Sequence, residues 1–328
     1  MPAVSIIITT HNRPHLVVRA VESARAASRK DIEIVVVDDA SKDETAQVCR
    51  SIVDINYVRA ERNQGVAGAR NLGILQSSGD YLSFLDDDDV RLPGSLEAQV
   101  EALASVPEAA FIYGQAILGR QDGSMTEQFY PAQAPQGDVF WELLTHNFVP
   151  AGATVFRRSC LYRVGLLDDA IPGVDDWDLW VRLAELYPVL ALEQPVMVWR
   201  QAAPHSGQGS SRAIEMVKCG CTQFRGRWLK LPRAVQASPA RRRKSWDMFS
   251  DRMARHLFWE AWRTASVGKI WQAQKMLLAA MRYCPKAAAR VLIQPASLPL
   301  LLTHARRERQ AIRSARQLYP ESVSRNRQ

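Results

Sequence analysis

Cysteine is scarce in this chain, and long apolar runs are absent. The five cysteines among 328 residues show no repeated Cys-x-x-Cys spacing, which argues against a disulfide scaffold and against a closed zinc site. No uncharged apolar stretch reaches the roughly 18 residues of a membrane-spanning helix, and the longest candidate, 291–303, contains two prolines. The apolar residues after Met1 are not preceded by the charged segment of a signal peptide. We therefore expect a reduced, cytoplasmic protein that does not span a membrane.

The net charge of the whole chain, +8, combines two regions of opposite sign. Residues from His205 onward carry 25 Lys and Arg against 6 Asp and Glu, whereas the first 204 residues carry 17 against 28. Apolar residues make up 47% of the chain and charged residues 23%, which is enough for a large core and excludes a globally disordered chain. The sequence predicts an acidic globular part followed by a basic tail.

Short apolar runs alternate with helical patterns in the first part of the chain. Strands are predicted at 4–8, 32–37, 55–59 and 81–85, and helices at 14–27, 43–52 and 65–76. This alternation predicts an α/β fold with a mostly parallel sheet flanked by helices. Ligands of such sheets bind beyond the carboxyl ends of the strands, where this sequence places polar residues.

The pattern is weaker in the remainder of the chain. Strands are predicted at 154–157 and 189–199, and a helix at 177–186. From about Ser206 the chain is basic, rich in tryptophan and helical in pattern. Segment 255–290 is predicted to be a helical hairpin that turns near Val267 and Gly268.

Four consecutive aspartates, 86–89, follow the fourth predicted strand. Side chains alternate along an extended backbone, so Asp86 and Asp88 are expected on one face. Two carboxylates there can hold a hard divalent ion and leave positions open for phosphate oxygens. A solvated acidic turn is the alternative, but the polar ends of the neighbouring strands favour a metal site.

Asp38 and Asp39 end the second predicted strand. A carboxylate in this place can accept a hydrogen bond from the ring N–H of uracil or thymine. Capping of the next helix by Ser41 or Asp43 is compatible with that role.

A glycine-containing motif opens the third predicted helix. Gly65 and Gly68 permit close backbone approach, and a helix start favours anions, so that Arg70 is placed to meet a diphosphate. The motif is not the dinucleotide fingerprint Gly-x-Gly-x-x-Gly, which argues against a Rossmann dehydrogenase.

Asp175 and Asp176 stand directly before a predicted helix, where carboxylates are favoured as caps. One cap is sufficient, which leaves the second acid for general-base chemistry. Trp177 and Trp180 are candidates for the walls of a sugar pocket.

Taken in order, these motifs resemble those of the family 2 glycosyltransferases with the GT-A fold. They read Thr-Thr-His-Asn-Arg at 9–13, Val-Asp-Asp-Ala-Ser-Lys-Asp at 37–43, Asn-Gln-Gly-Val-Ala-Gly-Ala-Arg-Asn at 63–71, Phe-Leu-Asp-Asp-Asp-Asp at 84–89 and Asp-Asp-Trp-Asp-Leu-Trp at 175–180. The segment 156–168 resembles the one that precedes the family's Glu-Asp motif. The resemblance covers about residues 3–210. It implies a GT-A domain with a Rossmann-like nucleotide-sugar-binding half at 1–115 and an acceptor half at 116–205, before a basic helical extension at 206–328.

The resemblance also implies roles for the matching residues. It implies nucleotide contacts for Thr9, His11, Arg13, Asp38, Asp39, Arg70 and Asp87. It implies that Asp86 and Asp88 hold Mn²⁺ or Mg²⁺. Asp176 matches the second acid of the family's Glu-Asp motif, the catalytic base, and Asp175 stands beside it. His205, in a loop similar to the one that closes over the donor, is a further candidate metal ligand, with an ordinary loop histidine as the alternative.

Two positions depart from the family pattern. His11 replaces the usual Tyr and adds a titratable ring, and Asp175 replaces the usual Glu with a shorter side chain. The implied reaction is a single displacement with inversion from a UDP- or dTDP-sugar, in polysaccharide, glycolipid or other cell-surface glycan synthesis.

Three alternatives concern the function and the tail. A sugar-1-phosphate nucleotidyltransferase would need a Gly-rich triphosphate loop after the first strand, which residues 9–14 do not supply. The basic run 241–244 near Trp246 is compatible with nucleic-acid binding, but the acidic half would repel phosphate backbones. We therefore expect no nucleic acid and favour peripheral contact with anionic membrane at its cytoplasmic face, as suits a lipid-linked or glycan acceptor. Plain solubility remains an alternative role for the tail.

Overall fold

The computed structural model describes residues 3–27, 31–120, 124–200 and 210–293. The chain divides into two compact units, Met1–Trp246 and Asp247–Gln328, and their boundary lies within helix α10 (Pro239–Ser266). Across the residues described, none of the helices is long and apolar enough to cross a membrane.

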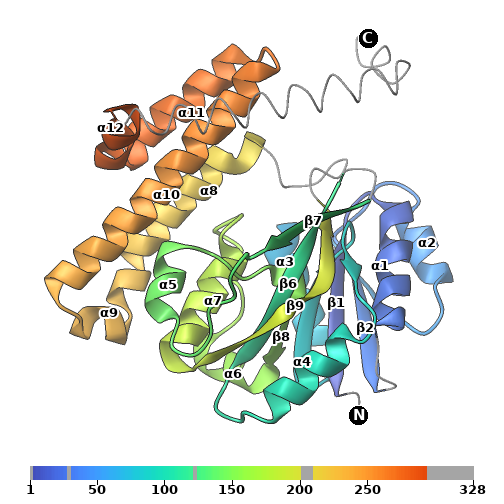
Figure 1. Ribbon diagram of the computed structural model, residues 1–328. Coiled ribbons are helices and arrows are strands. Elements are labelled where there is room, and N and C mark those ends of the chain that lie inside the picture. Colours follow the sequence, from blue (N-terminus) through green and yellow to red (C-terminus); the bar gives the residue numbers. More distant parts are fainter. Residues whose placement is uncertain (1–2, 28–30, 121–123, 201–209, 294–328) are drawn as a thin grey trace. The chain divides into compact units, whose positions relative to one another are not determined.

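A mixed sheet forms the centre of the first unit (Figure 1). Its strands are β1 (Val4–Thr10), β2 (Ile32–Asp38), β3 (Asn56–Arg59), β4 (Tyr81–Asp86), β5 (Val90–Arg91), β6 (Phe111–Gly119), β7 (Met125–Tyr130), β8 (Thr154–Arg157) and β9 (Val189–Arg200). Their order is β3-β2-β1-β4-β8-β6-β9-β5, and β7 pairs with β6. The first four strands in this order are parallel, which confirms the predicted α/β part. β8 is antiparallel to both β4 and β6.

Helices cover both faces of the parallel part. They are α1 (Pro14–Ala26), α2 (Thr45–Ser51), α3 (Gly65–Gln76) and, farther along, α4 (Ser95–Ala104). Every residue of β1 is buried, because alternate side chains of a central strand face opposite helix layers. Ile6 and Ile8 share a core with Val17 of α1. Ile7 lies against Gly73 of α3, where an added Cβ would come within 2.3 Å of the isoleucine side chain.

Two helices begin at residues other than those predicted. α2 begins at Thr45, and Asp43 precedes it, with Oδ1 accepting the Thr45 N–H at 3.0 Å. Helix α7 (Asp175–Leu186) begins two residues earlier than expected. Asp175 and Asp176 therefore occupy its first turn instead of preceding it.

Strand β6 is central in the second half of the sheet, although its sequence gave no clear signal. It pairs with β7, β8 and β9. An added Cβ at Gly114 would lie 2.4 Å from Val196, so glycine is required for β9 to approach. Short helices α5 (Phe140–Thr145), η1 (Ala151–Ala153) and α6 (Arg158–Val164) complete this half with α7.

The remaining helices are divided between the two units. α8 (Ser210–Gly226), η2 (Trp228–Lys230) and α9 (Pro232–Gln236) lie in the first unit. The second unit contains most of α10, α11 (Ile270–Tyr283) and α12 (Pro285–Ile293). α10 and α11 are joined by a turn with Gly268 at φ +83°, which confirms the predicted turn near Val267 and Gly268, but the second arm of the predicted hairpin at 255–290 is divided between α11 and α12.

Candidate functional site

The carboxyl ends of β1 and β2 lie side by side at one edge of the sheet. The N–H of Asp39 donates to the carbonyl of Thr10 at 2.9 Å. The half-buried ring of His11 lies between the two loops, with Nδ1 2.7 Å from the carbonyl of Asp39 and Nε2 2.9 Å from Nδ2 of Asn12. These distances fit the tautomer in which Nδ1–H donates to Asp39 and Nε2 accepts from Asn12. His11 is therefore fixed in orientation at this edge.

The carboxylates of Asp38 and Asp39 organise the loops around them. Asp38 is fully buried and accepts the N–H of Ser41 at 2.8 Å. Asp39 accepts the N–H groups of Gln64 and Gly65 at 2.8 and 2.9 Å, which caps the start of α3. Gly65 adopts φ +74°, a conformation in which glycine avoids the strain of a side chain. Contact of either carboxylate with a nucleotide base stays a prediction.

A tight turn after β4 gathers three carboxylates. The N–H of Asp89 donates to the carbonyl of Asp86 at 3.0 Å. In this turn, one oxygen each of Asp86, Asp88 and Asp89 lies within 4.8 Å of the others. Burial and the carboxylates of Asp86 and Asp87 raise the pKa of Asp88 to about 7, although Arg13 acts in the opposite direction. Clustered carboxylate oxygens are the ligands that Mn²⁺ and Mg²⁺ prefer, so these three residues, called the acid turn below, could hold such an ion.

Asp87 is held by side chains at the end of β1 and just after it. It accepts the hydroxyl of Thr10 at 2.7 Å on one oxygen and Nη1 of Arg13 at 2.7 Å on the other. The same Arg13 nitrogen lies 3.4 Å from Asp88. Arg13 and Thr10 thus tie the region after β1 to the turn after β4.

Arg70 links the acid turn to the start of α7. Its buried guanidinium donates from Nη2 to Asp86 at 2.8 Å, and Nη1 lies 3.5 Å from Asp175. Burial disfavours the charged guanidinium, but the carboxylates of Asp86 and Asp175 prevail and raise the pKa of Arg70. The sequence placed Arg70 beside a diphosphate; in this structure it bridges two carboxylates that belong to separate motifs.

The two acids that open α7 have different surroundings. Asp175 is buried against Arg70, whereas Asp176 is half-buried, and its Oδ1 accepts the N–H of Trp177 at 2.6 Å. Loss of hydration and the neighbouring carboxylate of Asp175 raise the pKa of Asp176 to about 7. A partly accessible carboxylate that titrates near neutral pH is suited to take a proton from a hydroxyl group.

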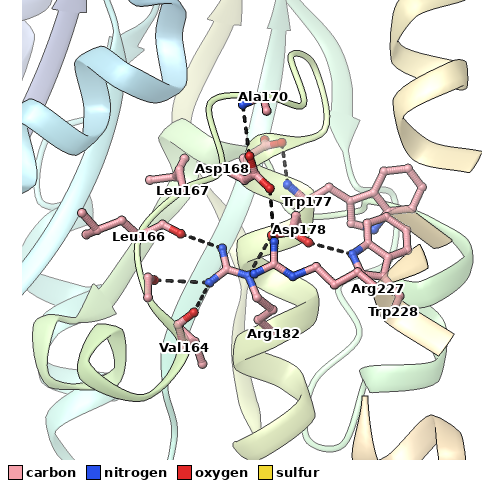
Figure 2. Close-up of polar contacts among 12 residues, drawn as sticks. Val164, Leu166, Leu167, Asp168, Ala170, Trp177, Asp178, Arg182, Arg227 and Trp228 are labelled. Atoms are coloured by element: carbon pink, nitrogen blue, oxygen red, sulfur yellow. Dashed lines mark hydrogen bonds and ion pairs between the residues drawn. The ribbon is translucent and has the colours of Figure 1, made fainter. Parts of the chain in front are cut away.

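The loop that leads into α7 is held by two side chains. Arg182 of α7 donates to the three consecutive carbonyls of residues 164–166 and, at 2.7 Å, to Asp178 (Figure 2). Asn71 of α3 donates to the carbonyl of Leu167 at 2.8 Å and accepts its N–H at 3.0 Å. The backbone that delivers the two acids is therefore anchored to α3 and to α7 itself.

Asp178 connects this loop to the region after α8. Its Oδ1 accepts Nε1–H of Trp228 at 2.9 Å, and its Oδ2 lies 3.3 Å from Arg227 (Figure 2). Arg227 also lies 3.3 Å from Asp168 in the loop. The buried charge of Asp178 is thus shared by two arginines and an indole.

The other predicted residues have varied placements. Thr9 is the last residue but one of β1 and lies opposite Asp86 in the register of β4, and His205 lies outside the described residues. The expectation that Trp177 and Trp180 wall a sugar pocket is wrong, because the two side chains are only 4% and 0% exposed. Trp180 packs among phenylalanine rings of the core.

Sequence reasoning gave no role to Thr10, Asn71 or Asp89. Thr10 stands inside a recognised motif, and Asn71 and Asp89 each end one. Their place in these motifs was the one sign in the sequence that they could matter. Their roles could not be read from it, because Thr10 and Asn71 bond to residues far away in the sequence.

Comparison of the sequence with known proteins identifies a family and relatives. The profile of glycosyl transferase family 2 matches residues 5–165. An uncharacterised glycosyltransferase of Rickettsia felis is 32% identical over 218 residues, which cover 64% of this chain and 36% of the relative. GalNAc(5)-diNAcBac-PP-undecaprenol beta-1,3-glucosyltransferase of Campylobacter jejuni is 31% identical over 134 residues, 39% of this chain and 42% of the relative. The matched part of this chain thus spans less than half the length of each of these two relatives.

Solved structures share the architecture. Mannosyltransferase PcManGT from Pyrobaculum calidifontis, in complex with GDP-Man and Mn²⁺, has a TM-score of 0.56 and 19% identity, and the match covers 98% of this chain and 88% of that protein. TarS 1–349 of S. aureus, in complex with UDP-GlcNAc, has a TM-score of 0.52 and 13% identity, and the match covers 86% of this chain and 91% of that protein. At these identities the likeness concerns the fold alone. From the family match and this shared architecture, the chain belongs to glycosyltransferase family 2 and has the GT-A fold.

Proposed function

We propose that this protein transfers a sugar from a nucleotide-diphosphate donor to an acceptor hydroxyl, with inversion at the anomeric carbon. The contacts of Arg70 with Asp86 and Asp175, called the Arg70 bridge below, are the main observation in support of the proposal. They join the acid turn to the first turn of α7. Candidate ligands for a metal and a candidate base thereby share one edge of the sheet. Membership of family 2 supports the same activity.

The donor side of the site consists of the acid turn and the loops after β1 and β2. We assign Asp86 and Asp88 to the metal, with Asp89 in the same turn and His205 as a further candidate. Bound Mn²⁺ or Mg²⁺ would act as a Lewis acid that offsets the charge developing on the leaving diphosphate. Arg13 holds Asp87 in place for contact with the donor ribose or sugar.

The base and ribose of the donor are assigned to the loops around His11. We assign Thr9, His11, Asp38 and Asp39 to this part of the site, with Arg70 beside it. A carboxylate acceptor for a pyrimidine N3–H favours UDP or dTDP over GDP. PcManGT was solved with GDP-Man, so GDP is the competitor that an experiment must include.

Asp176 is assigned as the general base. Its carboxylate takes the proton of the acceptor hydroxyl as oxygen attacks the anomeric carbon, on the face opposite the diphosphate. Asp175 holds Arg70 and thereby fixes the start of α7 relative to the acid turn. A positively charged anomeric centre develops as in glycoside hydrolysis, and attack from the opposite face inverts its configuration.

The acceptor is proposed to be a glycan or a lipid-linked sugar in cell-envelope glycan synthesis. The name of the Campylobacter jejuni relative includes an undecaprenol diphosphate-linked glycan, which supports the lipid-linked alternative. We further propose the division into a donor half at 1–115, an acceptor half at 116–205 and an extension at 206–328. The basic extension would hold a cytoplasmic enzyme at the anionic inner face of a membrane.

The test is release of nucleoside diphosphate from a panel of UDP-, dTDP- and GDP-sugars, with and without Mn²⁺. We expect slow, metal-dependent release from a UDP- or dTDP-sugar in water, and loss of release in Asp88→Asn. Pyrophosphate release from UTP and a sugar 1-phosphate, without cleavage of any nucleotide sugar, would instead identify a nucleotidyltransferase and overturn the proposal.

A further inference from the structure

Helix α11 has an apolar side that is exposed. Its inner side consists of small or flexible residues, Ala273, Met276 and Ala280, which are buried. Its outer side exposes the larger apolar residues Ile270, Trp271, Leu277, Leu278 and Met281. Trp271 is 69% exposed and Leu278 is 68% exposed, so these side chains contribute little to the core of the second unit.

Basic side chains accompany this apolar surface. Residues 271, 275, 278 and 282 form one row on a helix with 3.6 residues per turn, so Lys275 and Arg282 alternate with Trp271 and Leu278. Nζ of Lys275 lies 5.4 Å from the centre of the Trp271 ring. We call the exposed apolar residues of α11, together with Lys275 and Arg282, the α11 face.

The segment that contains the α11 face carries charge of a single sign. Residues 267–293 contain no Asp or Glu. They contain five exposed basic residues, Lys269, Lys275, Arg282, Lys286 and Arg290. Helix α12 adds Leu292 and Ile293, which are 60% and 78% exposed. Apolar and cationic side chains are thus combined without an anionic group among them.

We infer that the α11 face is the surface by which the protein docks on an anionic lipid bilayer. The inference rests on the membrane contact in the proposed function and locates that contact on one helix. Trp271 and the aliphatic side chains would enter the region between headgroups and acyl chains, while Lys275 and Arg282 extend toward lipid phosphates. Both contributions are required, because a basic segment alone binds weakly and only within a short distance of the membrane.

Other occupants of the α11 face fit its chemistry less well. A second copy would bring two basic faces together, and residues 294–328 carry seven Arg against two Glu, so both would be repelled. Nucleic acid would contact the cations, but Trp271 is the one aromatic ring of the α11 face, and the aliphatic side chains around it cannot stack on successive bases.

The basic run 241–244, which the sequence singled out, lacks such a surface. The guanidinium of Arg241 lies 4.4 Å from the centre of the Trp141 ring, and that of Arg225 lies 3.9 Å from the centre of the Trp246 ring. These indoles pack with arginines inside the first unit. The exposed apolar residue on α10 next to the run is Met248, at 43% exposure, so the run lies beside one accessible apolar side chain where the α11 face has five.

The test is co-sedimentation of the full chain with vesicles of phosphatidylcholine alone and with a quarter of the lipid replaced by phosphatidylglycerol. We expect binding only to the anionic vesicles. Replacing Trp271→Gln and Leu278→Gln together should weaken binding by roughly tenfold or more. A matched control, Leu75→Gln with Val235→Gln, removes apolar side chains that are 67% and 57% exposed elsewhere and should leave vesicle binding unchanged.

Charge variants separate the α11 face from the run at 241–244. Lys275→Gln with Arg282→Gln should weaken binding by roughly tenfold, whereas Arg243→Gln with Lys244→Gln should have a much smaller effect. Equal losses in the two pairs, or no binding to anionic vesicles, would overturn the inference. So would a lipid-free dimer in sedimentation velocity that Trp271→Gln with Leu278→Gln dissociates, because the face would then belong to a second copy.

Calorimetry with UDP on the same proteins distinguishes this inference from the proposed function. Vesicle binding without binding of any nucleoside diphosphate would overturn only the proposed function. UDP binding that persists when vesicle binding is absent would overturn only the docking surface.

Discussion

The guanidinium of Arg70 lies 3.5 Å from the buried carboxylate of Asp175, and this contact joins α3 to the first turn of α7. The same guanidinium holds Asp86 in the acid turn at 2.8 Å. One cation therefore sets the position of the candidate base region relative to the candidate metal ligands.

Removal of this cation should destabilise the protein. Arg70→Met preserves much of the side-chain volume but leaves Asp175 buried without its partner, which costs about 3–5 kcal/mol of unfolding free energy. Arg255→Met removes an exposed ion pair with Asp251 and should cost at most about 1 kcal/mol. Urea denaturation of the two variants measures the difference, and equal costs would contradict the bridging role of Arg70.

The rate of sugar transfer should depend on the ionisation of Asp176. Its pKa is raised to about 7, and a general base must be deprotonated, so kcat/KM should rise with pH and level off above about 7. Asp176→Asn should lower kcat by roughly 10²–10⁴-fold and leave the affinity for UDP unchanged. A variant that retains wild-type kcat would remove Asp176 from the reaction.

The metal-free protein should lose stability as pH rises. Burial and neighbouring acids raise the pKa of Asp88 to about 7, so the folded state favours the protonated form. That contribution is fully present below the pKa of the unfolded chain, about 4, and is lost as pH rises through about 7. Thermal unfolding in EDTA should therefore give a lower Tm at pH 8 than at pH 5, with a smaller difference in Asp88→Asn.

Asp43→Asn is the control for this pH dependence. Asp43 is exposed, and although its slight loss of hydration acts in the opposite direction, hydrogen bonds from Thr45 lower its pKa. Its contribution to stability is consequently present above the unfolded pKa, and is lost only as pH falls through the lowered value. The variant should keep the wild-type change in Tm between pH 5 and 8, and a flattened profile would show that the dependence does not come from the acid turn.

Asn71 should act on the reaction rate through the loop before α7. Asn71→Ala removes both hydrogen bonds to Leu167, and we expect kcat to fall by roughly tenfold or more, since small displacements of catalytic groups are costly. The Kd for UDP should not change. Asn56→Ala, which removes a side-chain bond to the carbonyl of Gln76 near the end of α3, should retain full activity. Parallel loss in both variants would indicate general destabilisation instead.

The parallel half of the sheet was predictable because its signals are local. Buried Ile and Val runs alternate with helices, and β1, β2 and β3, which follow one another along the chain, lie side by side in the sheet. β6 was missed because its partners β8 and β9 come much later and because Gly114 weakens the strand pattern. That glycine is explained only by the approach of Val196, a contact that no local pattern reveals.

The position of the acid turn was predicted correctly, but the backbone geometry assumed for it was wrong. Alternation along a strand placed Asp86 and Asp88 together, but a turn closed by the Asp89 N–H brings them together and adds Asp89. Trp177 and Trp180 were misassigned because adjacency to the two acids was given more weight than helical spacing, which indicates a core position. The Arg70 bridge was beyond prediction, since its partners come from β4 and α7.

The central claim is a metal-dependent nucleoside-diphosphate site at the acid turn, and calorimetry with UDP tests it most directly. UDP, dTDP and GDP should be titrated with Mn²⁺, with Mg²⁺ and with EDTA, into the wild type, Asp88→Asn and the Asp43→Asn control. We expect UDP or dTDP to bind only with a divalent ion, and Asp88→Asn to weaken binding by at least about tenfold, the cost of a lost ligand interaction of roughly 1.4 kcal/mol. UDP binding that is equally tight in EDTA and in Asp88→Asn would contradict the claim.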